Sequence, residues 1–219
     1  MAIYYKNKID IHTLLGVWKI EETEQELIND LNLNKQDKVI LNTLSHAKRR
    51  LEWLAARVLL RKLLKELDPA INLNIPLKLY INKAGKPTLQ NSNCHFSLSH
   101  SDKMASAIVS KCTPVGIDIE KMQPKIGKIS HKFMNEKEFE IVNNYSDKNK
   151  MLYIHWCAKE AAYKLIGKKG LSFSKDIILE DIDYPKKYQL TVSINHSGSL
   201  KKLTGFYKII NRYMLVYLC

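Results

Sequence analysis

The chain has 219 residues, 45% of them hydrophobic and 26% charged, and its 35 basic and 22 acidic side chains give a formal charge of +13. These proportions are those of a globular protein with its own core, and they exclude disordered, collagen-like and disulfide-scaffold chains. No apolar run reaches the roughly 18–20 residues that cross a bilayer, and the start is too charged for a signal peptide. We therefore expect a cytoplasmic protein whose surplus positive charge attracts polyanions of unspecified kind.

The four cysteines, Cys94, Cys112, Cys157 and Cys219, have neither the C-x-x-C pattern nor the spacing of a structural zinc site. We expect reduced, partly buried thiols.

The first half of the chain predicts helices followed by strands. Thr23 and Glu26 form a capping box that opens a short helix over Glu24–Leu31. Apolar residues recur three and four apart over residues 44–67, which predicts a long amphipathic helix with a basic opposite face, ended by Asp68-Pro69. The period then shifts towards two, and strands with intervening turns are predicted. The strands are at 77–81, 94–98, 104–110 and 114–120, with turns at 84–87 and 100–102.

The second half repeats this order. Residues 126–145 predict one loosely patterned helix, and Lys148–Ile166 predict a stronger helix stopped by Gly167. Further strands are predicted at 171–179, 188–194, 203–210 and 213–219. The fold class is therefore α+β, with an N-terminal half at 1–113 and a C-terminal half at 114–219.

One predicted strand carries two acids on the same face. In the segment Val115-Gly116-Ile117-Asp118-Ile119-Glu120, alternation sends the apolar side chains to the core and the others to the opposite face. Two carboxylates two residues apart repel each other, and a hard divalent cation would remove that repulsion. An exposed strand edge with solvated acids is the alternative.

A predicted helix carries a third acid. Trp156, Glu160 and Lys164 lie four apart on one face of Lys148–Ile166. Glu160 could supply a carboxylate to the same metal, and Lys164 could hold a phosphate oxygen. The alternative is an ordinary Glu-to-Lys pair on a helix surface.

Two turns carry polar residues that suit an anion. Ser99 and His100 lie at a strand end, without the surroundings of a serine hydrolase, and either hold a phosphate or satisfy their own turn. Lys86 stands between Gly85 and Pro87 and either contacts an anion or forms an ordinary surface turn. No common nucleotide-binding or zinc-peptidase motif is present.

Taken in order, these segments resemble the 4′-phosphopantetheinyl transferases, and the length resembles the two-domain, Sfp-type branch. The motifs that carry the resemblance are Gly85-Lys86-Pro87, Phe96-Ser97-Leu98-Ser99-His100-Ser101, Gly116-Ile117-Asp118-Ile119-Glu120, Phe133 to Glu138-Phe139, and Trp156-Cys157-Ala158-Lys159-Glu160-Ala161-Ala162-Tyr163-Lys164. The resemblance runs from about residue 54 to 171. It implies two similar α+β halves related by a pseudo-twofold, with the active site in the cleft between them.

The resemblance also implies a reaction. The 4′-phosphopantetheine group moves from coenzyme A to a serine of an apo acyl, peptidyl or aryl carrier protein, and adenosine 3′,5′-bisphosphate leaves. The family uses Mg²⁺, and Mn²⁺ can often replace it. We expect no nucleic-acid or membrane partner, a monomer because the two halves already form the cleft, and carrier docking near residues 126–139.

Carried over by position, the resemblance assigns the site residues. The metal ligands are Asp118, Glu120 and Glu160, and the catalytic residues are Asp118, Glu138, Glu160 and Lys164. The coenzyme A contacts are Arg57, Arg61, Lys86, Pro87, Ser99, His100 and Lys164. The base that takes the serine proton is left open between Glu160, Glu138 and a water held by the metal.

Three other functions compete with this one. The basic helix at 44–67 suits a nucleic-acid-binding protein without catalysis, although no known nucleic-acid motif is present. A family member that binds carriers without turnover is the second, and a metal-dependent phosphodiesterase that uses the same acids is the third.

Overall fold

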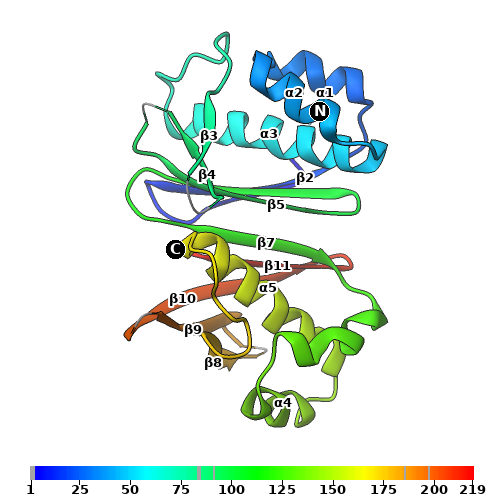
Figure 1. Ribbon diagram of the computed structural model, residues 1–219, viewed down its shortest axis with the longest axis vertical. Coiled ribbons are helices and arrows are strands. Elements are labelled where there is room, and N and C mark those ends of the chain that lie inside the picture. The colour runs from blue at the N-terminus through cyan, green and yellow to red at the C-terminus, as the bar shows by residue number, and fades with distance from the viewer. Residues whose placement is uncertain (1–2, 83–84, 91, 185, 197) are drawn as a thin grey trace. The chain divides into compact units, whose positions relative to one another are not determined.

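In the computed structural model, which describes residues 3–82, 85–90, 92–184, 186–196 and 198–219, the chain divides into two units, Met1–Val115 and Gly116–Cys219. Each unit combines helices with an antiparallel sheet (Figure 1), which confirms the α+β fold class. The pseudo-twofold and the cleft stay predictions. No helix in the described ranges is long and apolar enough to cross a membrane.

The first unit is built on a four-stranded sheet of order β1-β2-β6-β5. Its strands are β1 (Tyr5–Lys8), β2 (Thr13–Lys19), β5 (His95–Ser101) and β6 (Met104–Ser110). A separate hairpin pairs β3 (Leu79–Ile81) with β4 (Pro87–Leu89). The helices are α1 (Glu24–Leu31), α2 (Lys35–Thr43) and α3 (Ala47–Leu67).

Helix α3 organises the core of the first unit. It lies along the sheet of β2, β5 and β6 (Figure 1), and α1 packs against it. Leucines and alanines three and four apart fill the contact, among them Leu59, Leu60, Leu63 and Leu64, all fully buried. This is the amphipathic spacing that a helix needs to cover a sheet.

The second unit is built on a five-stranded sheet of order β7-β11-β10-β9-β8. Its strands are β7 (Gly116–Lys121), β8 (Ile177–Asp183), β9 (Gln189–His196), β10 (Ser199–Ile210) and β11 (Tyr213–Leu218). Its helices are a 3₁₀ segment η1 (Pro124–Lys132), α4 (Glu136–Asn143) and α5 (Lys148–Ile166).

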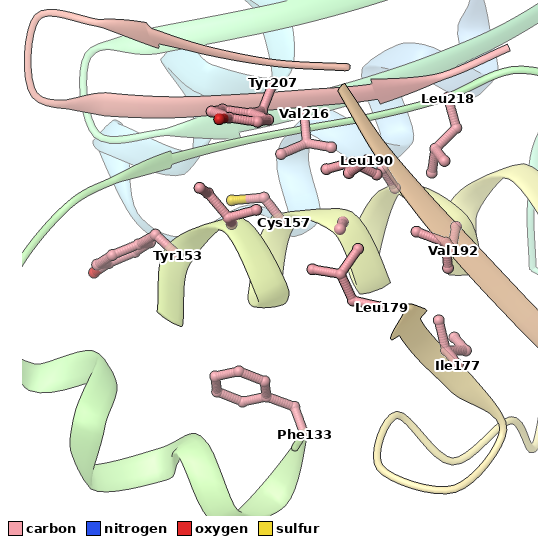
Figure 2. Close-up of a cluster of buried hydrophobic side chains, with 14 of the residues drawn as sticks. Phe133, Tyr153, Cys157, Ile177, Leu179, Leu190, Val192, Tyr207, Val216 and Leu218 are labelled. Atoms are coloured by element: carbon pink, nitrogen blue, oxygen red, sulfur yellow. The ribbon is translucent and has the colours of Figure 1, made fainter. Parts of the chain in front are cut away.

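Helix α5 covers one face of this sheet. Figure 2 shows Cys157 of α5 among side chains from β9 and β11, including Leu190 and Val216, while Phe133 lies on the other side of the helix. Gly167 ends α5 in the left-handed conformation, at φ 60°. The predicted helix Lys148–Ile166 and its stop are therefore confirmed.

Other predicted elements need correction. The predicted helix at 44–67 begins later, at Ala47, and the sequence analysis missed α2, although Asn34 and Asp37 form a capping box like that of Thr23 and Glu26. It also missed β1, β2 and β4. Strand β8 begins at Ile177 instead of residue 171, and the predicted turn residue Ala84 lies outside the described residues.

Two predicted boundaries are wrong for identifiable reasons. Residues 126–145 do not form one helix, because Asn135 caps a new helix by accepting the Glu138 N–H, and η1 and α4 are separate. His100 and Ser101 belong to strand β5, and the turn that follows is made by residues 102 and 103, with Asp102 at φ 57°.

Candidate active site

The acids of β7 lie beneath helix α5. Val115, Ile117 and Ile119 are fully buried, as alternation predicts. The opposite face is covered too, since Asp118 is only 2% exposed and Gly116 contacts the backbone of α5 near Ala161. The solvated-acid alternative is therefore excluded for Asp118, while Glu120 is half-buried on this edge strand.

Asp118 is paired with a lysine of α5. The Lys164 Nζ donates to Asp118 Oδ1 at 2.7 Å, and the Lys164 side chain remains partly exposed. Burial favours the neutral amine, but the nearby carboxylates of Asp118 and Glu160 outweigh it and raise the pKa of Lys164. Lys164 therefore carries a fixed positive charge among the acids.

Glu160 lies one helical turn before Lys164 and faces the same acids. Burial raises the pKa of Glu160 to about 7, the negative charges of Asp118 and Glu120 add to the rise, and Lys164 opposes it. Because Asp118 and Glu120 both act on the Glu160 carboxyl, the three predicted metal ligands form one electrostatic cluster. A carboxyl with this pKa exchanges its proton near neutral pH, as a general base must.

The cluster fits a hard divalent cation by its chemistry. It offers carboxylate oxygens and an excess of negative charge, which are what Mg²⁺ prefers in proteins. Within the described ranges, however, no three His, Cys, Asp or Glu side chains converge as they would around a metal ion.

Cys157 lies behind this cluster and is fully buried. Burial, together with the charges of Asp118 and Glu120, raises the pKa of its thiol well above the ordinary value. Such a thiol is inert, because the nucleophile is the thiolate. All four cysteines are free, as expected for reduced thiols.

Glu138 occupies a different place from the other predicted catalytic residues. Its side chain is 1% exposed and forms an ion pair with fully buried Lys159 at 2.7 Å. It also accepts the backbone N–H groups of Asn135 and Leu179 at 3.0 and 2.9 Å. These contacts join α4, α5 and β8, so Glu138 is held as a structural acceptor.

In the first unit, Ser99 and His100 lie at the end of β5. Ser99 is buried, whereas the His100 side chain is 41% exposed. The His100 Nδ1 lies 3.3 Å from the carboxylate of Glu52 on α3. The imidazole is therefore accessible to a ligand on one side and held by an acid on the other.

Lys86 and Pro87 lie in the β3–β4 hairpin. Asn82 fixes the turn by accepting the Lys86 N–H on its side chain at 2.9 Å, and Gly85 adopts φ 86°. Burial lowers the pKa of Lys86. Burial lowers the pKa of His95, at the start of β5, and the positive charge of Lys86 lowers it further.

Arg57 and Arg61 point into the first unit. Arg57 stacks on Trp53 at 3.4 Å, and Arg61, only 5% exposed, donates to the backbone carbonyls of Leu73 and Ile75. Burial lowers the pKa of both groups, that of Arg57 to about 10. Both arginines therefore support the fold locally, and both also line a small cavity beside Asp37.

Glu52 and the buried partner of Glu138 were not assigned a role from sequence. Glu52 stands one turn after Lys48 on α3, in a stretch whose basic residues drew attention first. The signal for the structural role of Glu138 was the capping box Asn135-Glu136-Lys137-Glu138, which marks Glu138 as a helix-start residue.

Comparison with known proteins gives matches in both units. Residues 114–206 match the family model described as the 4′-phosphopantetheinyl transferase superfamily, and residues 36–110 match the 4′-phosphopantetheinyl transferase N-terminal domain.

Curated relatives carry the same description. The chain is 29% identical over 151 residues to 4′-phosphopantetheinyl transferase gsp of Aneurinibacillus migulanus, covering 67% of this chain and 62% of the relative. It is 36% identical over 92 residues to psf-1 of Bacillus pumilus, covering 41% and 39%. It is 32% identical over 95 residues to Sfp of Bacillus subtilis strain 168, covering 42% of each. The matches thus span between two-fifths and three-fifths of these relatives.

Proposed function

The chain belongs to the 4′-phosphopantetheinyl transferase superfamily, on its Sfp-type branch, and we propose that it transfers 4′-phosphopantetheine from coenzyme A to a serine of an apo carrier protein. The observation that carries this proposal is the cluster of Asp118, Glu120 and Glu160 around Lys164, built from β7 and α5. The resemblance noted from the sequence assigns these residues, from both segments, to the metal ligands and the phosphate-contacting lysine.

In the proposed reaction, the carrier serine oxygen forms a bond to the β-phosphorus of coenzyme A. The bond from that phosphorus to the oxygen shared with the α-phosphate breaks, and adenosine 3′,5′-bisphosphate leaves with the electron pair. Lys164 stabilises the charge on the leaving phosphate because its ammonium is fixed beside Asp118. We assign the serine proton to Glu160, the carboxylate of this cluster that lies one helical turn before Lys164 on α5.

Glu160 is a better base than Glu138 on structural grounds. Both carboxylate oxygens of Glu138 already accept hydrogen bonds, from Lys159, Asn135 and Leu179. Taking a proton would break a buried ion pair. We therefore assign Glu138 to holding α4, α5 and β8 together.

Asp118, Glu120 and Glu160 are the residues that would hold Mg²⁺, or Mn²⁺ in its place. The support is the donor set of three carboxylates, since Asp118 and Glu120 add to the rise that burial causes in the pKa of Glu160. When bound, the ion would neutralise phosphate charge and remove that repulsion.

For coenzyme A we retain Ser99, His100, Lys86 and Pro87 as contacts in the first unit, and omit Arg57 and Arg61. The retained residues lie on the end of β5 and on the β3–β4 turn. The omitted guanidiniums are engaged with Trp53 or with backbone carbonyls.

Carrier docking is proposed at η1 and α4. Ile129 and Ile141 are exposed there, at 38% and 37%. Exposed Lys125, Lys128 and Lys132 lie on η1, the same segment as Ile129. Exposed basic and apolar side chains on one segment suit an acidic partner that buries an apolar contact.

The basic face of α3 does not favour the nucleic-acid alternative. Lys48 pairs with Asp102, Arg50 pairs with Glu24, and Lys65 donates to backbone carbonyls at the end of the helix. Much of the charge that would meet a phosphate backbone is thus neutralised or occupied within the unit.

The test is intact-protein mass spectrometry of an apo carrier protein mixed with this protein, coenzyme A and Mg²⁺. A mass gain of one phosphopantetheine, abolished by EDTA, is expected. Asp118→Asn should abolish the gain while the protein stays folded by circular dichroism, and Asp181→Asn, at an exposed acid of β8 outside the proposed docking surface, is the control. Unmodified carriers from several pathways, or normal turnover by Asp118→Asn, would overturn the assignment.

A further inference from the structure

An acid of α3 holds the exposed histidine of β5. The Glu52 carboxylate is 7% exposed and lies 3.3 Å from His100 Nδ1. The backbone N–H of Asp102 also hydrogen-bonds to that carboxylate. Glu52 therefore contacts the end of β5 at two points, the His100 imidazole and the backbone N–H of Asp102.

A second contact from the same helix fixes the following turn. Lys48, one helical turn before Glu52, donates to Asp102 Oδ1 at 2.8 Å. Asp102 adopts the left-handed conformation, at φ 57°, which lets the chain reverse into β6. Because two side chains of one rigid helix hold the turn, the orientation of the His100 ring is set by α3.

The charge around Glu52 is mixed. Burial raises the pKa of the Glu52 carboxyl, Lys48 and Arg49 of α3 oppose the rise, and Asp102 of the turn adds to it. A carboxylate at hydrogen-bond distance from Nδ1 favours the protonated ring and leaves Nε2–H as a donor.

We propose that Glu52 is a positioning residue that keeps the His100 imidazole protonated and oriented so that it recognises a phosphate monoester. The ligand group is the 3′-phosphate that distinguishes coenzyme A from dephospho-coenzyme A, so the inference rests on the proposed function. Glu52 itself would repel that phosphate, and its contribution is made through the ring.

The first measurement needs no ligand. NMR titration of the His100 ring in the free protein should give a lower midpoint in Glu52→Gln than in wild type. Glu66→Gln is the matched control, because it removes an acid of the same helix from an exposed pair with Lys6. Equal midpoints in wild type and Glu52→Gln would overturn the proposal.

The second measurement is calorimetric binding of coenzyme A and of dephospho-coenzyme A at about pH 6 and about pH 8. Glu52→Gln should bind coenzyme A about five- to tenfold more weakly at the higher pH, because a charge-assisted hydrogen bond is lost. At the lower pH, where the ring is protonated in both proteins, the affinity of Glu52→Gln for coenzyme A should return to that of wild type. The affinity for dephospho-coenzyme A should be the same in both proteins at both pH values.

A merely structural role for Glu52 predicts something different. The affinity of Glu52→Gln for both ligands would then fall by the same factor at both pH values, and that result would overturn the proposal. The proposal would also be overturned if Glu52→Gln kept the wild-type ratio of affinities for coenzyme A and dephospho-coenzyme A at both pH values. If the ratio of affinities for coenzyme A and dephospho-coenzyme A changes in Glu52→Gln as expected but no carrier is modified, the proposed transfer fails and this inference stands. If carriers are modified and that ratio does not change, only this inference fails.

Discussion

The backbone carbonyl of Ala161 on α5 lies directly over Gly116 on β7: a Cβ at Gly116 would come within 2.0 Å of that oxygen and 2.9 Å of Leu165 Cβ. Neither atom belongs to the flexible end of a side chain, so the helix and the strand could not both stay in place. The glycine thus sets the distance between the element that carries Asp118 and the element that carries Glu160 and Lys164.

Gly116→Ala should therefore destabilise the protein by about 3 kcal/mol or more, as severe overpacking does. Chemical denaturation followed by circular dichroism measures this. Gly127→Ala is the control, because a Cβ there meets only Leu152 Cδ1, at 3.9 Å. A Gly116→Ala protein as stable as the control would contradict the described packing of α5 on β7.

The buried pair of Lys159 and Glu138 gives a second prediction. Lys159→Met leaves the Glu138 carboxylate buried without its charged partner, and the expected cost is about 3–5 kcal/mol in the free energy of unfolding. Adding Glu138→Gln to that variant should recover part of the loss, because the buried charge is removed while a side-chain oxygen remains.

The double-mutant cycle distinguishes this pair from two independent contacts. The coupling free energy between Lys159 and Glu138 is expected to be well above about 0.5 kcal/mol, the error within which independent substitutions add. Lys202→Met is a surface control, since its pair with Glu180 is exposed and such pairs contribute about 0–1 kcal/mol. Additive effects at Lys159 and Glu138 would refute the ion pair as a stabilising unit.

The contrast between Glu138 and Asp118 shows how far the sequence could go. Alternation along β7 correctly separated Asp118 from Ile117 and Ile119, because side chains of a strand point to opposite faces. It could not show that a helix covers the acidic face, since that depends on a contact between segments some 40 positions apart. Gly116 is the one local sign of this contact, because a residue without a Cβ leaves room for the backbone of α5 to approach.

Helices with strong caps and regular spacing were the most predictable elements. Lys148–Ile166 and its stop at Gly167 followed from both signals. Arg57 and Arg61 were harder, because a basic residue on a helix is usually solvated, and here each turns inward to stack on an aromatic ring or bond to carbonyls beyond the helix. Neither contact leaves a periodic signal in the sequence.

Carrier docking should depend on ionic strength. The exposed lysines of η1 and the overall charge of +13 predict an apparent affinity for an acidic carrier that weakens as salt rises, because exposed charges are screened beyond roughly 8–10 Å. The double variant Lys128→Glu/Lys132→Glu should weaken docking and flatten the salt dependence. Lys201→Glu, an exposed change on β10, is the control.

Steady-state assays over a salt series measure this as the KM for carrier protein. The KM for coenzyme A and the kcat should change little in the η1 variant, because η1 is assigned no role in the chemistry. A KM for carrier that is independent of salt in wild type would place docking elsewhere.

The raised pKa of Glu160 makes the stability of the metal-free protein depend on pH. Its ordinary pKa is 4.5 and its folded value is about 7, so between these values the folded protein holds a proton that the unfolded chain has lost. The free energy of unfolding must then fall as pH rises through this window, by about 1–3 kcal/mol from this group. Below the window the group is protonated in both states, and its ionisation no longer opposes folding.

Glu160→Gln removes this titration and should be more stable than wild type at about pH 8 but not at about pH 4. Denaturation in EDTA at several pH values measures the difference, with Glu140→Gln of α4 as an exposed control. Adding Mg²⁺ should raise the stability of wild type at the higher pH and leave that of Glu160→Gln nearly unchanged, because a cation among the acids offsets the repulsion only where the third carboxylate is present. Parallel pH profiles for wild type and Glu160→Gln would mean that Glu160 is not held among the charges of Asp118 and Glu120.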